Sequence, residues 1–433
     1  MPDEMLRRAI SRLVREAEPP ARPFVPGTTP VPVSGKVVGA PERELMVEAA
    51  LDGWLTTGRF NRAFERALAD FLGAPHVLTV NSGSSANLVA LSAFTSRRFG
   101  DRAIRPGDEV ITVAAGFPTT IAPILQVGAV PVFLDVDSRT WNMDAAQLEA
   151  ALSPRTRAVM LAHTLGMPFD AAAVAAFCEA HGLWFIEDCC DALGATWGGR
   201  PVGSFGHVGT LSFYPAHHIT TGEGGAVFTR DAAVARAAAA FRDWGRHCHC
   251  APGQDNACGH RFDGQYGELP PGYDHKYVYS EAGYNLKMTD LAAACGVAQM
   301  ERLPGFIAKR RENYAFLRAY LEGCPHLRFV EPPEEAGPSW FGMPLLLEES
   351  APLSRTDLLR ALNRRGIGTR LLFAGNAVRQ PFMEGRTYRT VGPLAHSDII
   401  MERGFWLGVW PGLTADMLQW TASSLRQLLE GAA

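Results

Sequence analysis

Short apolar runs rich in β-branched residues alternate with helical segments through the middle of the chain, and this alternation constrains the fold more than any other feature. The runs predicted as strands are His76–Val80, Glu109–Val113, Val130–Val136, Arg157–His163 and Leu183–Asp188. Helical patterns such as SSANLVALSAF and DAAAVAAFCEA separate them. Near-continuous apolar strands separated by helices predict an α/β fold with a mainly parallel sheet covered by helices on both faces. Such sheets bind ligands at the carboxyl ends of their strands.

The order of these patterns divides the 433 residues into three parts. Residues 1–40 are predicted to form an N-terminal helix and an extended arm, because a charged amphipathic start is followed by a Pro-rich connector. Residues 41–300 are predicted to form a large domain. It contains an insertion loop at 248–277 that is rich in Gly, Pro, His and Cys, and loops of that length are usually functional. Residues 301–433 are predicted to form a smaller C-terminal α+β domain.

The charge and hydropathy of the chain exclude several classes of partner. A net charge of -4 gives no electrostatic basis for binding nucleic acid or an anionic membrane surface. The chain contains no run of about 18 apolar residues, so no membrane span is predicted. The N-terminal segment lacks the apolar core of a signal peptide, so we expect a cytoplasmic protein. In that setting the eight cysteines are expected to be free thiols or metal ligands rather than disulfides.

The segment NSGSSANL, at residues 81–88, follows a predicted strand and opens a predicted helix. Gly83 lets the backbone approach a ligand closely, and Ser84 adds a hydroxyl beside the free N–H groups of the helix start. This combination predicts an anion site, most simply for a phosphate. An ordinary N-capped turn is the alternative interpretation.

Glu187 and Asp188 end the last predicted strand of the series. A carboxylate there either caps a turn or pairs with the ring nitrogen of a pyridoxal-type cofactor, which keeps the ring protonated as an electron sink. Ser212, on another strand, would add a phosphate ligand. The segment that follows it, SFYPAHHITTGEGGAV, has the setting of a cofactor lysine but carries His217 and His218 instead.

The motifs NSGSSANL, AAGFPTT, HTLGMPFD, IEDCCDALG, SFYPAHHITTGEGG and GYNLKMTDL occur in this order. From about residue 45 onward the chain thereby resembles the sugar aminotransferase family named after DegT, DnrJ, EryC and StrS. The resemblance implies the fold of type I pyridoxal-phosphate aminotransferases, a large domain that binds the cofactor, and a homodimer. By motif match, the cofactor-binding residues would be Gly83, Ser84, Phe117, Asp188, Asp191, Ser212 and Asn285.

The resemblance also implies a role for each of these residues. Gly83, Ser84 and Ser212 would hold the phosphate. Asp188 would pair with the pyridinium nitrogen, and Phe117 would stack on the ring. Asp191 takes the place of a family glutamine near the ring hydroxyl, and Asn285 would reach the phosphate across the dimer interface.

The Schiff-base lysine of the family falls five residues after Ser212, at His217. Imidazole cannot form a Schiff base, but it can move a proton near neutral pH. The resemblance then implies that pyridoxamine 5′-phosphate binds noncovalently, with pyridoxal 5′-phosphate as the alternative form. The cofactor would condense with a nucleotide-linked 4-keto-6-deoxy sugar. His217 would take a proton from the cofactor methylene carbon, and the hydroxyl at C-3 would leave.

Four cysteines form a second pattern. Cys190 and Cys248 are separated by 57 residues, and Cys250 and Cys258 follow Cys248. Thiolates at these spacings suit either a [2Fe–2S] cluster or a structural zinc. The pattern resembles that of the iron–sulfur 3-dehydrase branch of the family, which acts on CDP- and dTDP-linked sugars. Asp188 and Cys190 are two apart at a strand end, so their side chains are predicted to point the same way and Cys189 away. The thiols expected to be packed are Cys178, Cys189, Cys295 and Cys324.

The predicted function is therefore an NDP-4-keto-6-deoxyhexose 3-dehydrase. C-3 dehydration would be followed by cluster-relayed one-electron reduction to a 3-deoxy sugar, with electrons from a separate NAD(P)H-dependent flavin, iron–sulfur or ferredoxin-type reductase. One alternative is a metal-independent 3-dehydratase with a structural zinc, and another is an inert regulator that binds the cofactor or the sugar. The nucleotide of the substrate, CDP or dTDP, stays open, as does the presence of a hydroxyl group at C-2 of the sugar. Arg370 and Arg379 are the candidate substrate residues, although a structural salt bridge explains Arg370 equally well.

Overall fold

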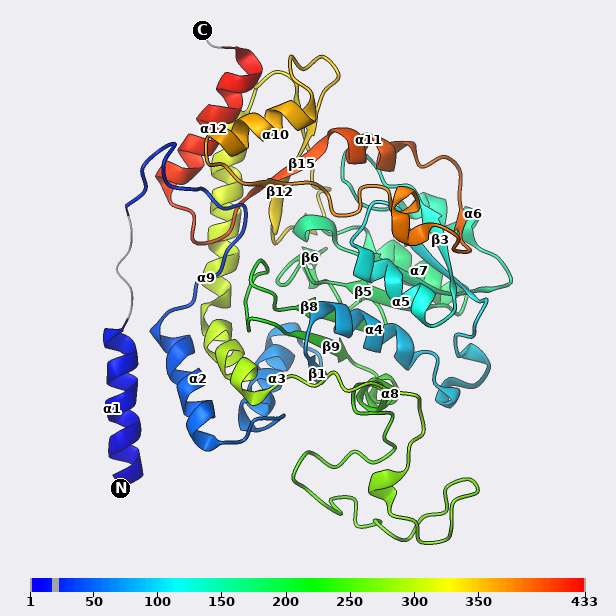
Figure 1. Cartoon of the computed structure of the whole chain (residues 1–433). Helices are drawn as coiled ribbons and strands as arrows, with labels where there is room; N and C mark the ends of the chain where they lie inside the picture. Colours follow the sequence, from blue (N-terminus) through cyan, green and yellow to red (C-terminus); the bar gives the residue numbers. More distant parts are fainter. Residues whose placement is uncertain (1, 18–22, 432–433) are drawn as a thin grey trace.

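The structure is a computed structural model that describes residues 2–17 and 23–431 (Figure 1). Residues 18–22, in the predicted Pro-rich arm, lie outside the described residues, as do 1 and 432–433. The amphipathic start forms α1 (Pro2–Glu16), which packs beside α2 (Ala40–Asp52). Arg7 Nη1 lies 3.2 Å from Asp52 Oδ1 across this contact.

An eight-stranded sheet forms the centre of the molecule, in the order β1-β9-β8-β5-β4-β2-β3-β14. Five neighbouring pairs, from β8 through β14, are parallel, whereas β9 runs antiparallel to both β1 and β8. The strands are β1 (His76–Val80), β2 (Glu109–Val113), β3 (Val130–Leu134), β4 (Thr156–Ala162), β5 (Trp184–Asp188), β8 (Val208–Ser212), β9 (Gly225–Thr229) and β14 (Arg389–Thr390). The five predicted strands and the mainly parallel sheet are confirmed.

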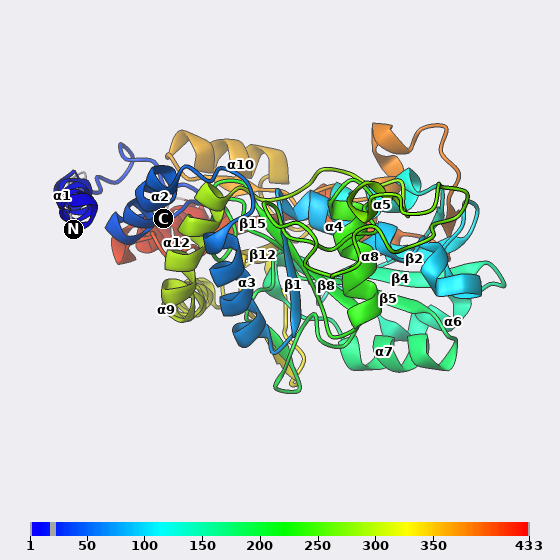
Figure 2. The same ribbon diagram turned by 90° about the horizontal axis from the view of Figure 1, so that it is seen from below.

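Helices cover both faces of this sheet, and Figure 2 shows α4, α5 and α8 on one side and α7 on the other. Alternate strand residues pack into the two hydrophobic cores, one on each face of the sheet, because successive side chains point to opposite faces. Val110 and Met160 pack with α4 and α8, whereas Ile111 and Val159 pack with α7. The helices of this part are α3 (Arg59–Leu72), α4 (Gly83–Ala93), α5 (Pro118–Gln126), α6 (Leu148–Ala151), α7 (Ala171–Ala180) and α8 (Ala232–Arg242).

The His217 segment is the connection between antiparallel β8 and β9. Ser212 pairs with Gly225, so the intervening residues emerge at the carboxyl end of β8. At this edge Asp188 also ends the parallel neighbour β5. The strand pairing therefore brings the histidine and the carboxylate to the same edge of the sheet.

One helix, α9 (Asp290–Leu321), links the large sheet to the C-terminal part and runs unbroken through residues 300 and 301. Its first half packs with α3, and its second half packs under a four-stranded antiparallel sheet of order β10-β12-β15-β13. The elements there are β10 (Leu327–Phe329), β12 (Gly342–Leu347), α10 (Arg355–Arg364), β13 (Thr369–Arg370), α11 (Ala395–Arg403), β15 (Gly404–Gly408) and α12 (Ala415–Glu430).

Short elements complete the description of the chain. A three-stranded sheet joins β11 (Ala336–Gly337), β6 (Thr196–Trp197) and β7 (Arg200–Pro201). The 3₁₀ helices are η1 (Arg97–Arg102), η2 (Ala145–Gln147), η3 (Thr164–Gly166), η4 (His275–Tyr277), η5 (Ala377–Arg379) and η6 (Pro381–Met383). The insertion loop at 248–277 contains η4 alone and projects beyond α8 in Figure 1. Within the described residues, every helix is too short or too polar to cross a bilayer.

The pairing of β14 with β3 fixes the C-terminal part to the large sheet, and a buried carboxylate supports it. Glu109 Oε2 accepts from Arg389 Nη2 at 2.7 Å, and Glu109 Oε1 accepts from the exposed Arg155 at 2.7 Å. Arg389→Ala leaves a buried charge with fewer donors, so we expect a loss of about 1–3 kcal/mol in the free energy of unfolding. Chemical denaturation measures it. The exposed Arg386→Ala is the control, and equal stability of both variants would contradict this role.

Candidate active site

A cavity of about 550 Å³ opens at the carboxyl ends of the central strands. The parallel-sheet rule predicts a ligand site at this edge. The cavity gathers most of the side chains singled out in the sequence: Gly83, Ser84, Phe117, Asp188, Cys190, Asp191, Ser212, His217 and Arg370. Five predicted site residues do not line it: Asn285, Arg379, Cys248, Cys250 and Cys258.

The start of α4 forms one wall of the cavity. Ser82 caps the helix by accepting from Ser85 N at 3.1 Å, which leaves the first N–H groups of the helix facing the cavity. A Cβ on Gly83 would lie 2.4 Å from Ser212 Cβ and 3.1 Å from Cys190 Sγ. Because Gly83 has no side chain, the start of α4 packs directly against Ser212 and Cys190. Bare helix N–H groups beside two serine hydroxyls fit a phosphate.

The carboxylate of Asp188 is fixed at the back of the cavity by donors from three segments. Its Oδ2 accepts from Asn87 Nδ2 at 2.7 Å and from Thr120 Oγ1 at 2.8 Å. Its Oδ1 accepts from Cys190 N at 3.1 Å. A buried carboxylate held in this way, beside a phosphate cradle, fits the pyridinium nitrogen of pyridoxamine or pyridoxal phosphate.

His217 lies beside Asp191, with Nδ1 buried 3.4 Å from Asp191 Oδ1. Burial, reinforced by the positive charge of Arg310, lowers the pKa of His217 to about 3. Burial and the neighbouring Asp188 charge raise the pKa of Asp191 to about 8. The two therefore face each other at pH 7 as a neutral imidazole and a neutral carboxyl group, and not as an ion pair. A neutral imidazole has the protonation state that a general base requires.

Arg310, from α9, holds the backbone of the histidine segment. Its guanidinium is fully buried and donates to the carbonyl oxygens of Ala216 at 3.1 Å and His217 at 2.8 Å. It also donates to those of Trp340 at 3.3 Å and Phe341 at 3.1 Å. One cation therefore joins the β8–β9 connection to the segment entering β12.

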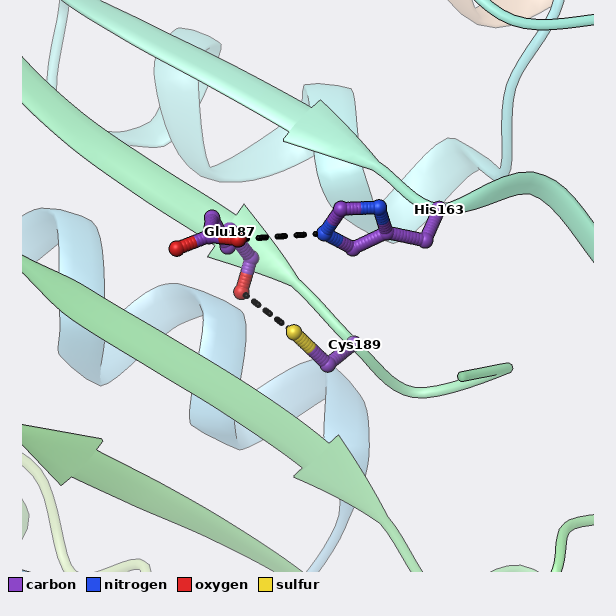
Figure 3. Close-up of side chains that lie close together, drawn as sticks. All are labelled: His163, Glu187 and Cys189. Atoms are coloured by element: carbon purple, nitrogen blue, oxygen red, sulfur yellow. Dashed lines mark hydrogen bonds and ion pairs between the residues drawn. The ribbon is translucent and has the colours of Figure 1, made fainter. Parts of the chain in front are cut away.

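A second histidine lies at the rim of the same cavity, in the group His163, Glu187 and Cys189 (Figure 3). His163 Nε2 lies 3.2 Å from Glu187 Oε2. The carboxylate already accepts from Gly203 N at 2.8 Å and Gly206 N at 2.5 Å. Burial raises the pKa of the Cys189 thiol, which donates to the Glu187 carbonyl at 3.7 Å. Because the Glu187 carboxylate already has backbone donors, a structural His163–Glu187 pair is favoured and a metal site is not.

The mouth of the cavity is formed by aromatic side chains from both parts of the chain. Phe117 meets the ring of Phe373 edge to face at 5.2 Å between centroids. Phe341, Leu371 and Trp406 complete this side. Arg370 points its guanidinium to the carbonyl of Thr369 at 2.9 Å and stays exposed at the rim.

Arg379 and Asn285 have other partners. The Arg379 guanidinium pairs with the carboxylate of Asp398. The Asn285 side chain accepts from Lys287 Nζ at 2.8 Å, and its backbone bridges to Asp243 at the base of the insertion loop. The structure therefore places Arg379 away from the cavity and Asn285 on the loop side of the chain.

The four predicted metal-binding cysteines fall into two sets. Asp188 and Cys190 both line the cavity while Cys189 does not, which confirms the predicted side-chain directions. Cys248, Cys250 and Cys258 line a separate small hollow in the insertion loop. Among the described residues, the four thiols do not come together as one ligand group. A single chain in this conformation therefore does not fit a [2Fe–2S] cluster or a four-thiolate zinc site. The four thiols expected to be packed, Cys178, Cys189, Cys295 and Cys324, are buried.

Sequence reasoning missed several residues that shape the site. Asn87 lies one helical turn after Gly83 in the phosphate motif, and that spacing was a usable signal. Thr120 follows the predicted strand Glu109–Val113 within the quoted AAGFPTT motif. Arg310 carried no local signal, because a basic residue in an amphipathic helix is normally exposed.

The fold and this site define the class of enzymes with the pyridoxal-phosphate-dependent aminotransferase fold. The chain belongs to the DegT/DnrJ/EryC1/StrS aminotransferase family, whose model matches residues 38–426. The predicted family and fold class are confirmed.

Three similar proteins illustrate the range of the family. The chain is 55% identical over 427 residues to lipopolysaccharide biosynthesis protein RfbH of Salmonella typhimurium, covering 98% of both chains. It is 48% identical over 415 residues to dTDP-4-dehydro-2,6-dideoxy-D-glucose 3-dehydratase of Saccharopolyspora spinosa, covering 96% of this chain and 89% of the other. A solved GDP-4-keto-6-deoxymannose-3-dehydratase with a trapped PLP-glutamate geminal diamine is 25% identical, with a TM-score of 0.81. That match covers 92% of this chain and 99% of the other.

Gly83 gives a direct test of the phosphate site. In Gly83→Ala the added methyl group would collide with Ser212, and such overpacking costs about 1–3 kcal/mol. Because this collision would displace Ser212 from the start of α4, we expect cofactor affinity to fall about tenfold or more, or about 1.4 kcal/mol of binding free energy, measured by absorbance titration with pyridoxal 5′-phosphate. Gly305→Ala, on an open surface of α9, should bind normally. Unchanged cofactor affinity in Gly83→Ala would show that the phosphate does not bind at this position.

Proposed function

We propose that the protein is an NDP-4-keto-6-deoxyhexose 3-dehydrase that works with pyridoxamine 5′-phosphate. One observation carries this proposal: the cavity holds a neutral imidazole and no lysine. The lysines of the chain are Lys36, Lys276, Lys287 and Lys309, and none lines the cavity. A transaminase of this fold needs an amine to hold and release its cofactor. An imidazole at that position supports proton transfer instead.

The residues of the cavity suit a reaction in which a proton leaves carbon and a hydroxyl group leaves the sugar. When bound, pyridoxamine phosphate supplies an amine for the 4-keto group and a ring that accepts electrons. Asp188, fixed by Asn87 and Thr120, keeps the ring nitrogen protonated. His217 lies with Nδ1 3.4 Å from Asp191 Oδ1, and the unprotonated nitrogen of its neutral imidazole would take the proton from the carbon beside the ring.

The surroundings of His217 support its use as the base. The bonds from Arg310 to the carbonyl oxygens of Ala216 and His217 hold the backbone that carries the imidazole, so the ring keeps its place when it gains a proton. The charge of Arg310 also keeps the resting imidazole neutral. Phe117, Phe373 and Trp406 at the mouth limit the access of water to the reacting carbon.

The exposed guanidinium of Arg370 at the rim suits the pyrophosphate of a nucleotide sugar, because a guanidinium binds phosphate through two parallel hydrogen bonds. The similarity to a dTDP-sugar 3-dehydratase over nearly the whole chain favours a dTDP-linked substrate over a GDP-linked one. CDP stays an alternative.

The reduction that completes 3-deoxygenation needs single electrons from a separate reductase. We propose that Cys190, Cys248, Cys250 and Cys258 hold a [2Fe–2S] cluster, which would supply one-electron transfer beside the cofactor. The position of Cys190 against the phosphate cradle supports this, because an electron carrier ligated there would lie close to the ring. In the structure, Cys190 and the three loop cysteines lie in separate hollows, so ligation of one cluster by all four would require them to be brought together.

His217→Asn tests the base. The variant should keep the fold and cofactor affinity, while C-3 dehydration slows by about 10²–10⁴-fold, the usual contribution of a general base. The measurement is release of the C-3 hydroxyl in single turnovers, with cofactor binding in parallel. His181→Asn, on a partly exposed histidine outside the cavity, is the control. Dehydration at the parent rate would show that another group takes the proton, and no dehydration by the parent would favour an inert binding protein.

Substitution of the cysteines distinguishes the iron–sulfur enzyme from the metal-independent alternative. Changing Cys190, Cys248, Cys250 or Cys258 to Ser should remove iron and sulfide, because a hydroxyl is a poor ligand for soft metals. Exchange of the cofactor methylene proton should survive, and reductase-dependent formation of the 3-deoxy sugar should stop. Cys178→Ser and Cys324→Ser, both buried elsewhere, should retain the metal and the activity. Zinc without iron, together with turnover in the absence of a reductase, would establish the metal-independent alternative.

A further inference from the structure

Phe373 lies at the mouth of the cofactor cavity with its backbone in the left-handed region. Its φ is 38°, and it lines the cavity together with Phe117. A bulky residue in this conformation is an outlier, because its Cβ crowds the following carbonyl oxygen. Such strain persists only where the surrounding structure fixes the backbone, and it occurs mostly at active sites, ligand clamps and switch regions.

Hydrogen bonds hold the turn around Phe373 between the two parts of the chain. On one side the carbonyl oxygen of Leu371 accepts from Trp406 Nε1 at 3.0 Å, and it also accepts from Phe373 N at 2.8 Å. On the other side Ala374 N donates to the Gly116 carbonyl oxygen at 3.1 Å. Trp406 lies on β15 and Gly116 lies between β2 and α5. Relaxation of the Phe373 backbone would therefore displace the turn from one of the two parts.

The ring of Phe373 contacts the ring of Phe117 across the cavity mouth. The two rings meet at 82° with their centroids 5.2 Å apart, the edge-to-face arrangement that aromatic pairs prefer. Phe117 is 44% exposed, and within the described part of the chain its ring meets no other aromatic ring. Gly116, which receives the bond from Ala374, is its neighbour in sequence. The turn therefore restrains both the ring of Phe117 and the backbone beside it.

Phe117 also connects this turn to the carboxylate at the back of the cavity. It is the N-cap residue of α5, and its carbonyl oxygen accepts from Thr120 N at 3.1 Å. Thr120 Oγ1 in turn donates to the Asp188 carboxylate at 2.8 Å. The backbone of Phe117 is thereby fixed by the first turn of α5. The orientation of its exposed ring is left to the contact with Phe373.

We propose that Phe373 is a positioning residue for the cofactor and acts through Phe117. Its ring holds the Phe117 ring in the orientation that stacks on the pyridine ring of the cofactor. The strained turn keeps Phe373 at the mouth, because the bonds from Trp406 and to Gly116 fix the backbone on both sides. This inference rests on the proposed function, since it takes Phe117 to be the residue that stacks on pyridoxamine phosphate.

A double-mutant cycle on cofactor affinity tests the proposal. Phe373→Leu removes the ring and keeps an apolar side chain. Its affinity for pyridoxal 5′-phosphate, measured by absorbance titration, should fall about two- to tenfold, the usual contribution of an aromatic pair. In a Phe117→Leu background the same change should have no further effect, because the ring on which Phe373 acts is gone. Phe373→Tyr keeps the ring and should bind the cofactor like the parent protein.

Phe316→Leu is the matched control, because it removes an exposed ring that pairs with Tyr320 on α9, outside the cavity. It should leave cofactor affinity unchanged. Additive losses from Phe117→Leu and Phe373→Leu, or parent-like affinity of Phe373→Leu, would overturn this inference alone. Parent-like affinity of Phe117→Leu would remove the ring stacking from the proposed function, and the role of Phe373 with it.

The strain at Phe373 has a measurement of its own, which does not need the cofactor. Glycine adopts a positive φ without steric cost, whereas alanine does not. Phe373→Gly should therefore unfold at a higher denaturant concentration than Phe373→Ala, and both should bind pyridoxal 5′-phosphate as weakly as Phe373→Leu. At Phe316, inside helix α9, the order should reverse, because glycine is the poorer helix former. A more stable alanine variant at position 373 would show that the backbone there is not strained and would overturn the constraint on which the proposal depends.

Discussion

The hydrogen bonds to the Asp188 carboxylate are the interactions on which the rest of the site depends. Its oxygens accept from Asn87 on α4, from Thr120 on α5 and from the backbone after β5, and Asn87 Oδ1 in turn accepts from Thr210 Oγ1 on β8 at 2.6 Å. A buried carboxylate is stable only when its oxygens find donors, so this network fixes the helices relative to the strands. The start of α4, where we propose that the phosphate binds, and the carboxylate proposed to meet the cofactor ring are therefore positioned by the same contacts.

Burial controls the chemistry of the histidine that stands in the place of a lysine. In a cavity of low polarity a charged group is costly, and the buried Arg310 makes a second positive charge nearby costlier still. His217 is therefore neutral and Asp191 protonated at pH 7. The same guanidinium holds the carbonyl of His217. One cation thus sets both the position and the charge of the proposed base, and it comes from the helix that links the two parts of the chain.

Residues from two parts of the chain form the cavity. The strand ends of the large sheet supply the polar groups, and the segments around Phe341, Arg370 and Trp406 supply the apolar mouth. The pairing of β14 with β3 and the unbroken α9 fix these parts to each other. The insertion loop is separate from this construction, because its bonds tie it to the base of α8 and leave its thiols outside its own cavity.

The sequence by itself determined five strands of a mainly parallel sheet and the histidine at the expected lysine position, because hydrophobic periodicity and residue spacing are local signals. The phosphate site at Gly83 stays a prediction. The sequence also predicted that Asp188 and Cys190 share a side, since residues two apart in a strand do so. Only the tertiary structure decided that Asn87 and Thr120 hold Asp188 and that Arg310 is buried on the His217 backbone. The division of the four cysteines between two sites was equally invisible in their spacing. These features depend on contacts between segments far apart in the chain, and sequence spacing does not record such contacts.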